Sequence, residues 1–186
     1  MEAPALITHH RRPFLLPVWL SMLAVVIAIG VAAVVYRSAK TTVVVLVRPV
    51  EKEVGTIDDP PLSNEGEQRA ARLAKMFGET SAAGRLNAIY VSAARRAQQT
   101  AAPLANVLGT RPIVVPVNDV KGTASRVMRE HEGGTVLIVG TSENVPQLLR
   151  TLSGHDAPVR ADDDTDTVFV VSIPTFGDSN VLRLRY

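Results

Sequence analysis

The sequence predicts an α/β fold: a three-layer α/β/α sandwich with a mostly parallel sheet and a C-terminal antiparallel hairpin, preceded by one transmembrane helix. Three observations predict it. An uncharged apolar segment lies near the N-terminus, short apolar runs alternate with helical patterns from Thr41 onward, and two strand patterns joined by a short turn end the chain. Alternation of this kind is typical of a parallel sheet covered by helices.

The apolar segment runs from Phe14 to Tyr36 without a charged residue. As a helix it spans roughly 34 Å, enough to cross a bilayer core. We therefore predict a transmembrane helix over residues 14–36, preceded by a tail over residues 1–13. A cleaved signal peptide is the alternative, but the segment is longer than a usual signal core and no convincing cleavage site follows it before Lys40.

The remainder, residues 41–186, reads as one domain. Residues 41–47, TTVVVLV, form a continuous β-branched run, the pattern of a strand buried on both faces. The elements expected next are a helix at 64–78, a strand at 86–92, a helix at 93–109, a strand at 111–117, a helix at 119–131, a strand at 135–140, a helix at 144–154, and hairpin strands at 166–174 and 180–186. Pro103 predicts a bend or restart in its helix.

The charge distribution argues against nucleic-acid binding. The chain has 20 Lys and Arg against 18 Asp and Glu, and Arg11, Arg12, Arg37 and Lys40 flank the apolar segment, which leaves the domain close to neutral. Nucleic-acid binding needs a concentrated positive face. The chain has no cysteine, which excludes disulfides, thiol nucleophiles and thiolate metal sites.

Ligands in open α/β sheets collect at loops that leave the carboxyl ends of strands. Three such loops are informative: VRPVEK at 47–52, SAARRAQQTA at 92–101 and VGTSENVP at 139–146. With these loops, and with PPLSNEGEQRA, HEGGTVLIVG and ADDDTDTVFVV in order, the chain resembles the histidine phosphatase superfamily, the phosphoglycerate-mutase-like fold. The resemblance is to the branch whose loops read RHAEK and GHSNTVP.

In that family the first-loop histidine attacks phosphorus, two arginines hold the phosphoryl oxygens, and the last-loop histidine supports the transferring group. The resemblance assigns the arginine roles to Arg48 and Arg96. It places Pro49 and Thr141 where the two histidines belong, and none of the four histidines of the chain falls at either position. Proline has no side-chain atom that could attack phosphorus, and a threonine hydroxyl is a weak nucleophile without an adjacent base.

A phosphate site without a nucleophile would use Arg48 and Arg96 with the hydroxyls of Ser92, Thr141 and Ser142. The alternative is that both arginines are structural and pair with acids of the chain. The acidic run at residues 162–166 lacks the glycine turn and distal glutamate of a calcium loop, so we expect no metal and no cofactor.

These observations lead to a membrane-anchored pseudophosphatase that binds a phosphorylated small molecule or a protein partner. Two alternatives stay open: an active phosphomonoesterase that uses a non-histidine nucleophile or an activated water, and a structural subunit of a membrane complex with a collapsed pocket. The resemblance to a branch with exported members suggests a periplasmic or extracellular domain, although the positive charges that follow the span do not favour that orientation.

Overall fold

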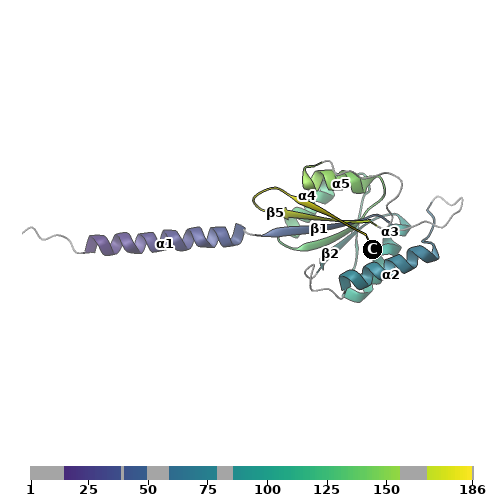
Figure 1. Ribbon diagram of the computed structural model, residues 1–186, viewed down its shortest axis with the longest axis horizontal. Coiled ribbons are helices and arrows are strands. Elements are labelled where there is room, and N and C mark those ends of the chain that lie inside the picture. The colour runs from purple at the N-terminus through teal and green to yellow at the C-terminus, as the bar shows by residue number, and fades with distance from the viewer. Residues whose placement is uncertain (1–14, 39, 50–58, 79–85, 156–166, 186) are drawn as a thin grey trace, which may run out of the picture. The chain divides into compact units, whose positions relative to one another are not determined.

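The computed structural model describes residues 15–38, 40–49, 59–78, 86–155 and 167–185 (Figure 1). The chain divides into two compact units, Met1–Ser38 and Ala39–Tyr186. The predicted tail at residues 1–13 and the acidic run at residues 162–166 lie outside the described ranges.

The first unit contains one helix, α1 (Leu15–Ser38). Its segment Val18–Tyr36 is long and apolar enough to cross a membrane, judged by length and composition. A signal sequence near the N-terminus has the same properties. The helical conformation expected for this segment is therefore present.

The second unit alternates strands and helices. Its elements are β1 (Thr41–Val47), α2 (Asn64–Gly78), β2 (Leu86–Ser92), α3 (Arg95–Leu108), β3 (Ile113–Val115), α4 (Val120–Glu130), β4 (Thr135–Val139), α5 (Asn144–Ser153), β5 (Thr167–Pro174) and β6 (Asn180–Arg185). They build a six-stranded sheet in the order β3-β2-β4-β1-β5-β6. The strands β1 to β4 pair in parallel, whereas β5 is antiparallel to both β1 and β6.

The sheet is the middle layer of a sandwich, which confirms the predicted α/β fold. Figure 1 shows α4 and α5 on one face and α2 and α3 on the other. Alternation along β1 explains how both faces are filled: Val44 and Leu46 pack under α4 and α5, while Val45 and Val47 pack against α2 and α3. All four side chains are fully buried, as the β-branched run predicts.

Two elements differ from the prediction. The helix α3 continues through Pro103 instead of restarting there, since the buried Ala101 and Leu104 hold the segments before and after it on the sheet. The strand β3 has only three residues, shorter than expected. Pro112 and Pro116 flank it, and neither has an N–H to donate to a neighbouring strand.

Candidate functional site

The carboxyl ends of the parallel strands form one edge of the sheet, and the sequence-predicted site residues gather along it. The strand register aligns Val47 with Val139 on β4 and with Val168 on β5, and aligns Val139 with Val91 on β2. The next residues along these strands therefore occupy a common row at that edge. They are Arg48, Ser92, Gly140 and, because β5 runs in the opposite direction, Thr167.

Arg48 is the most unusual member of this row. Its side chain is only 4% exposed, and its Nε has no hydrogen-bond partner within the part of the chain that the structure describes. A guanidinium group stays protonated in proteins, and leaving a buried charged donor unpaired is costly. Within the described residues, no hydrogen bond compensates the burial of this Nε.

Two further donors near this edge share that property. Ser92 ends β2 with a side chain that is 1% exposed, and its Oγ has no partner among the described residues. Arg96 lies in the first turn of α3, directly after the β2 edge, and its Nε is likewise buried without a described partner. The strand and helix ends thus bring three of the predicted phosphate-binding residues to one side of the molecule.

The start of α3 also holds a carboxylate that sequence reasoning missed. Both oxygens of Asp59 accept hydrogen bonds from the main-chain N–H of Arg95, at 3.1 and 3.0 Å. Negative charge at a helix N-terminus is stabilised by the exposed N–H groups and the helix dipole. Nothing in the sequence marks this contact, because it joins residues from two different loops.

Thr141, which the sequence resemblance placed at the last-loop histidine, makes two hydrogen bonds at the start of α5. Its main-chain N–H donates to Asn144 Oδ1 at 2.6 Å, and the N–H of Asn144 donates back to Thr141 Oγ1 at 3.2 Å. This reciprocal pair has the pattern of a capping box and closes the turn that leads into α5, whose N-cap residue, Glu143, makes no side-chain capping bond. A Cβ at Gly140 would overlap Asn144 Oδ1, so glycine is needed there. The neighbouring Ser142 is exposed.

Pro49 follows Arg48 directly and is buried. Its ring supplies neither a nucleophile nor a proton donor to the edge. Glu51 and Lys52, which complete the first-loop motif, lie outside the described residues.

Thr167 was not expected from the sequence. It is fully buried, and its Oγ1 has no partner in the described ranges. Residues two apart in a strand point to the same face of the sheet. Thr167 therefore shares the face of Phe169, and Ser92 shares the face of Tyr90, which is the face covered by α4 and α5. Only the register of β5 against β1 places Thr167 opposite Arg48, and a single sequence does not contain that register.

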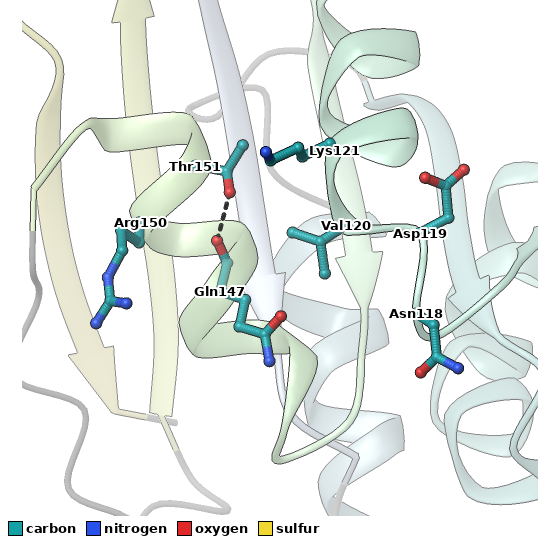
Figure 2. Close-up of a pocket in the computed structure, with 7 residues that line it drawn as sticks. All are labelled: Asn118, Asp119, Val120, Lys121, Gln147, Arg150 and Thr151. Atoms are coloured by element: carbon teal, nitrogen blue, oxygen red, sulfur yellow. Dashed lines mark hydrogen bonds between the residues drawn. The ribbon is translucent and has the colours of Figure 1, made fainter.

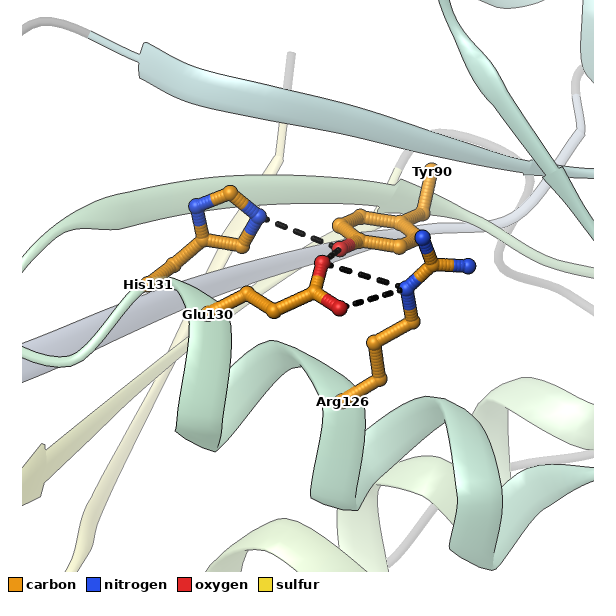
Figure 3. A network of polar contacts seen from close by, with 4 residues as sticks. All are labelled: Tyr90, Arg126, Glu130 and His131. Carbon is orange, nitrogen blue, oxygen red and sulfur yellow. Dashed lines mark hydrogen bonds and ion pairs between the residues drawn. The ribbon is translucent and has the colours of Figure 1, made fainter.

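His131 belongs to a separate polar network (Figure 3). Its Nε2 lies 3.1 Å from the hydroxyl of Tyr90, which donates to Glu130 Oε2 at 3.4 Å, while Arg126 Nε donates to both oxygens of Glu130 at 3.1 Å. The bond from Arg126 holds the pKa of Glu130 below its ordinary value. Burial, followed by the charge of Glu130, raises the pKa of Tyr90.

Neither His131 nor His155 is placed at the row that contains Arg48. His155 instead bonds through Nδ1 to the carbonyl oxygen of Ser153, just beyond α5. Among the described residues, no group of three or more His, Asp or Glu could hold a metal ion.

A cavity of about 590 Å³ lies between the start of α4 and the middle of α5, and Figure 2 draws its lining. In that view Lys121 points toward Thr151, whereas Arg150 points away from it. Asp119, which the sequence left without a role, accepts a hydrogen bond from the N–H of Gly122 at 3.0 Å and so caps α4. The lining side chains do not converge on a common point.

Comparisons with known proteins agree with this architecture. Residues 37–119 match the family described as the histidine phosphatase superfamily (branch 1). No curated protein shows significant sequence similarity to this chain.

Solved structures share the fold at low identity. The protein histidine phosphatase SixA complexed with tungstate is 17% identical, with a TM-score of 0.65, over 77% of this chain and 96% of that chain. A structure named mycobacterial hydrolase 1 is 15% identical, with a TM-score of 0.61, over 79% and 99%. Phosphoglycerate mutase from Plasmodium falciparum is 16% identical, with a TM-score of 0.58, over 78% and 91%. At these identities the likeness shows the fold.

Proposed function

We propose that this chain, whose folded domain belongs to the histidine phosphatase superfamily, is a membrane-anchored protein that binds a phosphorylated ligand without hydrolysing it. The observation that carries the proposal is the buried guanidinium of Arg48, whose Nε lacks a described partner. A phosphoryl group is the anion that the family resemblance assigns to this position. Bidentate, charge-assisted hydrogen bonds make arginine well suited to hold it.

The remaining donors support a site for an oxyanion. Ser92 Oγ and Arg96 Nε, both buried without described partners, come from the loop that follows β2. Thr167 adds a fourth polar atom of the same kind from β5. SixA was solved as a complex with tungstate, a tetrahedral oxyanion. We propose that this chain also binds a tetrahedral oxyanion, the phosphoryl group of its ligand.

The side chains available to attack phosphorus support binding over hydrolysis. Pro49, at the place of the nucleophilic histidine, has no suitable atom, and the hydroxyl of Thr141 already accepts a hydrogen bond in the α5 cap. Ser92 Oγ has no hydrogen bond to a base within the described residues. A serine hydroxyl needs such a base to become a nucleophile, so these contacts give the phosphomonoesterase alternative no support.

The anchor is the second part of the proposal. The helix α1 has 24 residues, which corresponds to about 36 Å and exceeds the roughly 30 Å of a bilayer core. Resemblance to a branch with exported members favours an exported domain. A reporter fused after Tyr186, active only on one side of the membrane, would decide the orientation.

Binding can be measured on the full chain reconstituted in lipid nanodiscs by titration calorimetry with inorganic phosphate, phosphoserine and tungstate. We expect Arg48→Ala to weaken binding by more than about tenfold, since a hydrogen bond to a charged group contributes about 1.5–3 kcal/mol. Arg96→Ala should act in the same direction. The exposed Arg111 is the matched control, and Arg111→Ala should bind like the unmodified chain.

Two results would redirect the proposal. Equal affinities of the Arg48→Ala and Arg111→Ala variants for phosphate would contradict a phosphate site at Arg48. This result would favour the structural subunit with a collapsed pocket. Release of phosphate from phosphoserine by the unmodified chain would instead favour the phosphomonoesterase.

A further inference from the structure

The end of the sheet opposite the phosphate site is held together by Lys40. Its carbonyl oxygen accepts two hydrogen bonds from Thr175, one from the main-chain N–H and one from Oγ1, both at 3.0 Å. Thr175 opens the turn between β5 and β6. These bonds therefore fix that turn to the residue directly before β1.

A second turn lies at the same edge. The N–H of Gly133, between α4 and β4, donates to Thr42 Oγ1 at 3.0 Å. A Cβ at Gly133 would come within 3.1 Å of the side chain of Lys40. We call the residues Lys40–Thr42, Gly133 and Thr175–Gly177 the amino edge of the domain.

The amino edge exposes one large apolar side chain. Phe176 is 73% exposed, more than any other large hydrophobic side chain among the described residues of the domain. Gly177 follows it with φ +103° and shapes the turn that presents it. Turns are usually occupied by Gly, Pro, Asn, Asp and Ser, and a phenylalanine ring in water forgoes the stabilisation that its burial would give.

Chain continuity indicates what this edge meets. Lys40 follows Ser38, the last residue of α1, by two positions, and two extended residues reach only about 7 Å. With α1 across a bilayer, the carbonyl of Lys40 lies close to the membrane surface. The two bonds from Thr175 then keep Phe176 close to that surface as well.

We propose that the amino edge docks on the lipid bilayer, with the ring of Phe176 entering the interfacial layer. This inference rests on the anchor in the proposed function. Lys40 and Asp178, which directly follows Gly177, are both exposed and carry opposite charges, so the contact depends on the apolar ring rather than on anionic lipid. Aromatic side chains favour the boundary between headgroups and acyl chains.

The docking sets the direction in which the phosphate site opens. Arg48 follows Lys40 by eight positions, with β1 between them, a distance of about 26 Å at roughly 3.3 Å per strand residue. The site therefore opens on the side of the domain away from the bilayer. Its ligand is a water-soluble phosphorylated molecule, and phosphorylated headgroups of the same membrane are out of reach.

A single tryptophan can report the contact in the full chain. The protein has one tryptophan, Trp19, within α1, so Trp19→Phe with Phe176→Trp places the only indole at the amino edge. The matched control carries Trp19→Phe with Leu184→Trp, at the opposite end of the same hairpin, where Leu184 is 38% exposed. Both variants are reconstituted in phosphatidylcholine vesicles whose acyl chains are brominated near the headgroup.

We expect the Phe176→Trp variant to emit at shorter wavelength than the Leu184→Trp variant in either lipid, because its indole lies in an apolar layer. Brominated lipid should reduce the emission of the Phe176→Trp variant, while the Leu184→Trp variant keeps the emission that it shows with unbrominated lipid. Equal emission of the Phe176→Trp variant in both lipids, in protein that stays with the vesicles after an alkaline carbonate wash, would overturn the docking and leave the anchor intact. Loss of the protein in that wash would overturn the anchor and the docking together. Phosphate binding, measured separately, would be unaffected by either result.

Discussion

Where β4 leads into α5, the main-chain N–H of Thr141 donates to Asn144 Oδ1 at 2.6 Å, and the main-chain N–H of Asn144 donates to Thr141 Oγ1 at 3.2 Å. Asn144 is 6% exposed, and its Nδ2 also reaches the carbonyl of Val117, at 3.5 Å. Thr141, which the family resemblance aligns with a histidine, is thereby tied to the start of the helix by its own hydroxyl and amide.

Substituting Asn144 should measure what that cap contributes. We expect Asn144→Ala to lower the free energy of unfolding by about 1–2 kcal/mol, since it removes a cap partner and leaves a buried N–H without its acceptor. Chemical denaturation of the reconstituted chain measures the change. Gln147→Ala, on an exposed position of the same helix, is the control, and equal stabilities of the two variants would contradict the assigned cap.

Ser92 should separate ligand binding from stability. Removing a buried hydroxyl without a partner costs the ligand-free fold nothing, so Ser92→Ala should leave the free energy of unfolding unchanged or raise it by up to about 1 kcal/mol. The same variant should bind phosphate several-fold more weakly because one donor is lost. Calorimetry and denaturation on one preparation give both numbers. A destabilised variant with unchanged affinity would show that Ser92 serves the fold alone.

The network around Glu130 predicts a dependence of stability on acid. The bond from Arg126 lowers the pKa of Glu130 below its ordinary value of 4.5, so the carboxylate stabilises the folded state above pH 4.5 and this contribution is lost as the pH falls through the folded-state pKa. Glu130→Gln should therefore show a smaller loss of stability on acidification than the unmodified chain. Glu132→Gln, an equal charge change on an exposed neighbour, should follow the unmodified chain in a thermal-denaturation series.

The sequence was sufficient to predict the strand ends that carry the site. Apolar runs such as residues 41–47 are long and β-branched enough to specify buried strands, and the polar residues after them must then meet at one edge. Arg48, Ser92 and Arg96 lie in or beside the loops found in this way. The phosphate-binding roles predicted for Arg48 and Arg96 came from the resemblance to the histidine phosphatase superfamily.

The contacts that pair residues across the sheet could not be predicted. Thr167 is opposite Arg48 only because β5 pairs antiparallel with β1 in one particular register. Asp59 reaches the amide of Arg95 from another loop, and its side chain resembles any other surface carboxylate in the sequence. The helix-breaking tendency of Pro103 was overruled by burial of its neighbours, a tertiary effect that local propensity does not include.

In the proposed function, the fold retains a phosphate site and lacks only the reacting imidazoles. Returning them with Pro49→His and Thr141→His should supply an unprotonated nitrogen nucleophile near neutral pH beside Arg48. The most direct measurement is phosphate release from a generic phosphomonoester by the full chain and by this double variant, each checked for folding by denaturation. We expect the unmodified chain to release no phosphate and the double variant to release a measurable amount. Robust release by the unmodified chain that is lost in Arg48→Ala would contradict the proposed function.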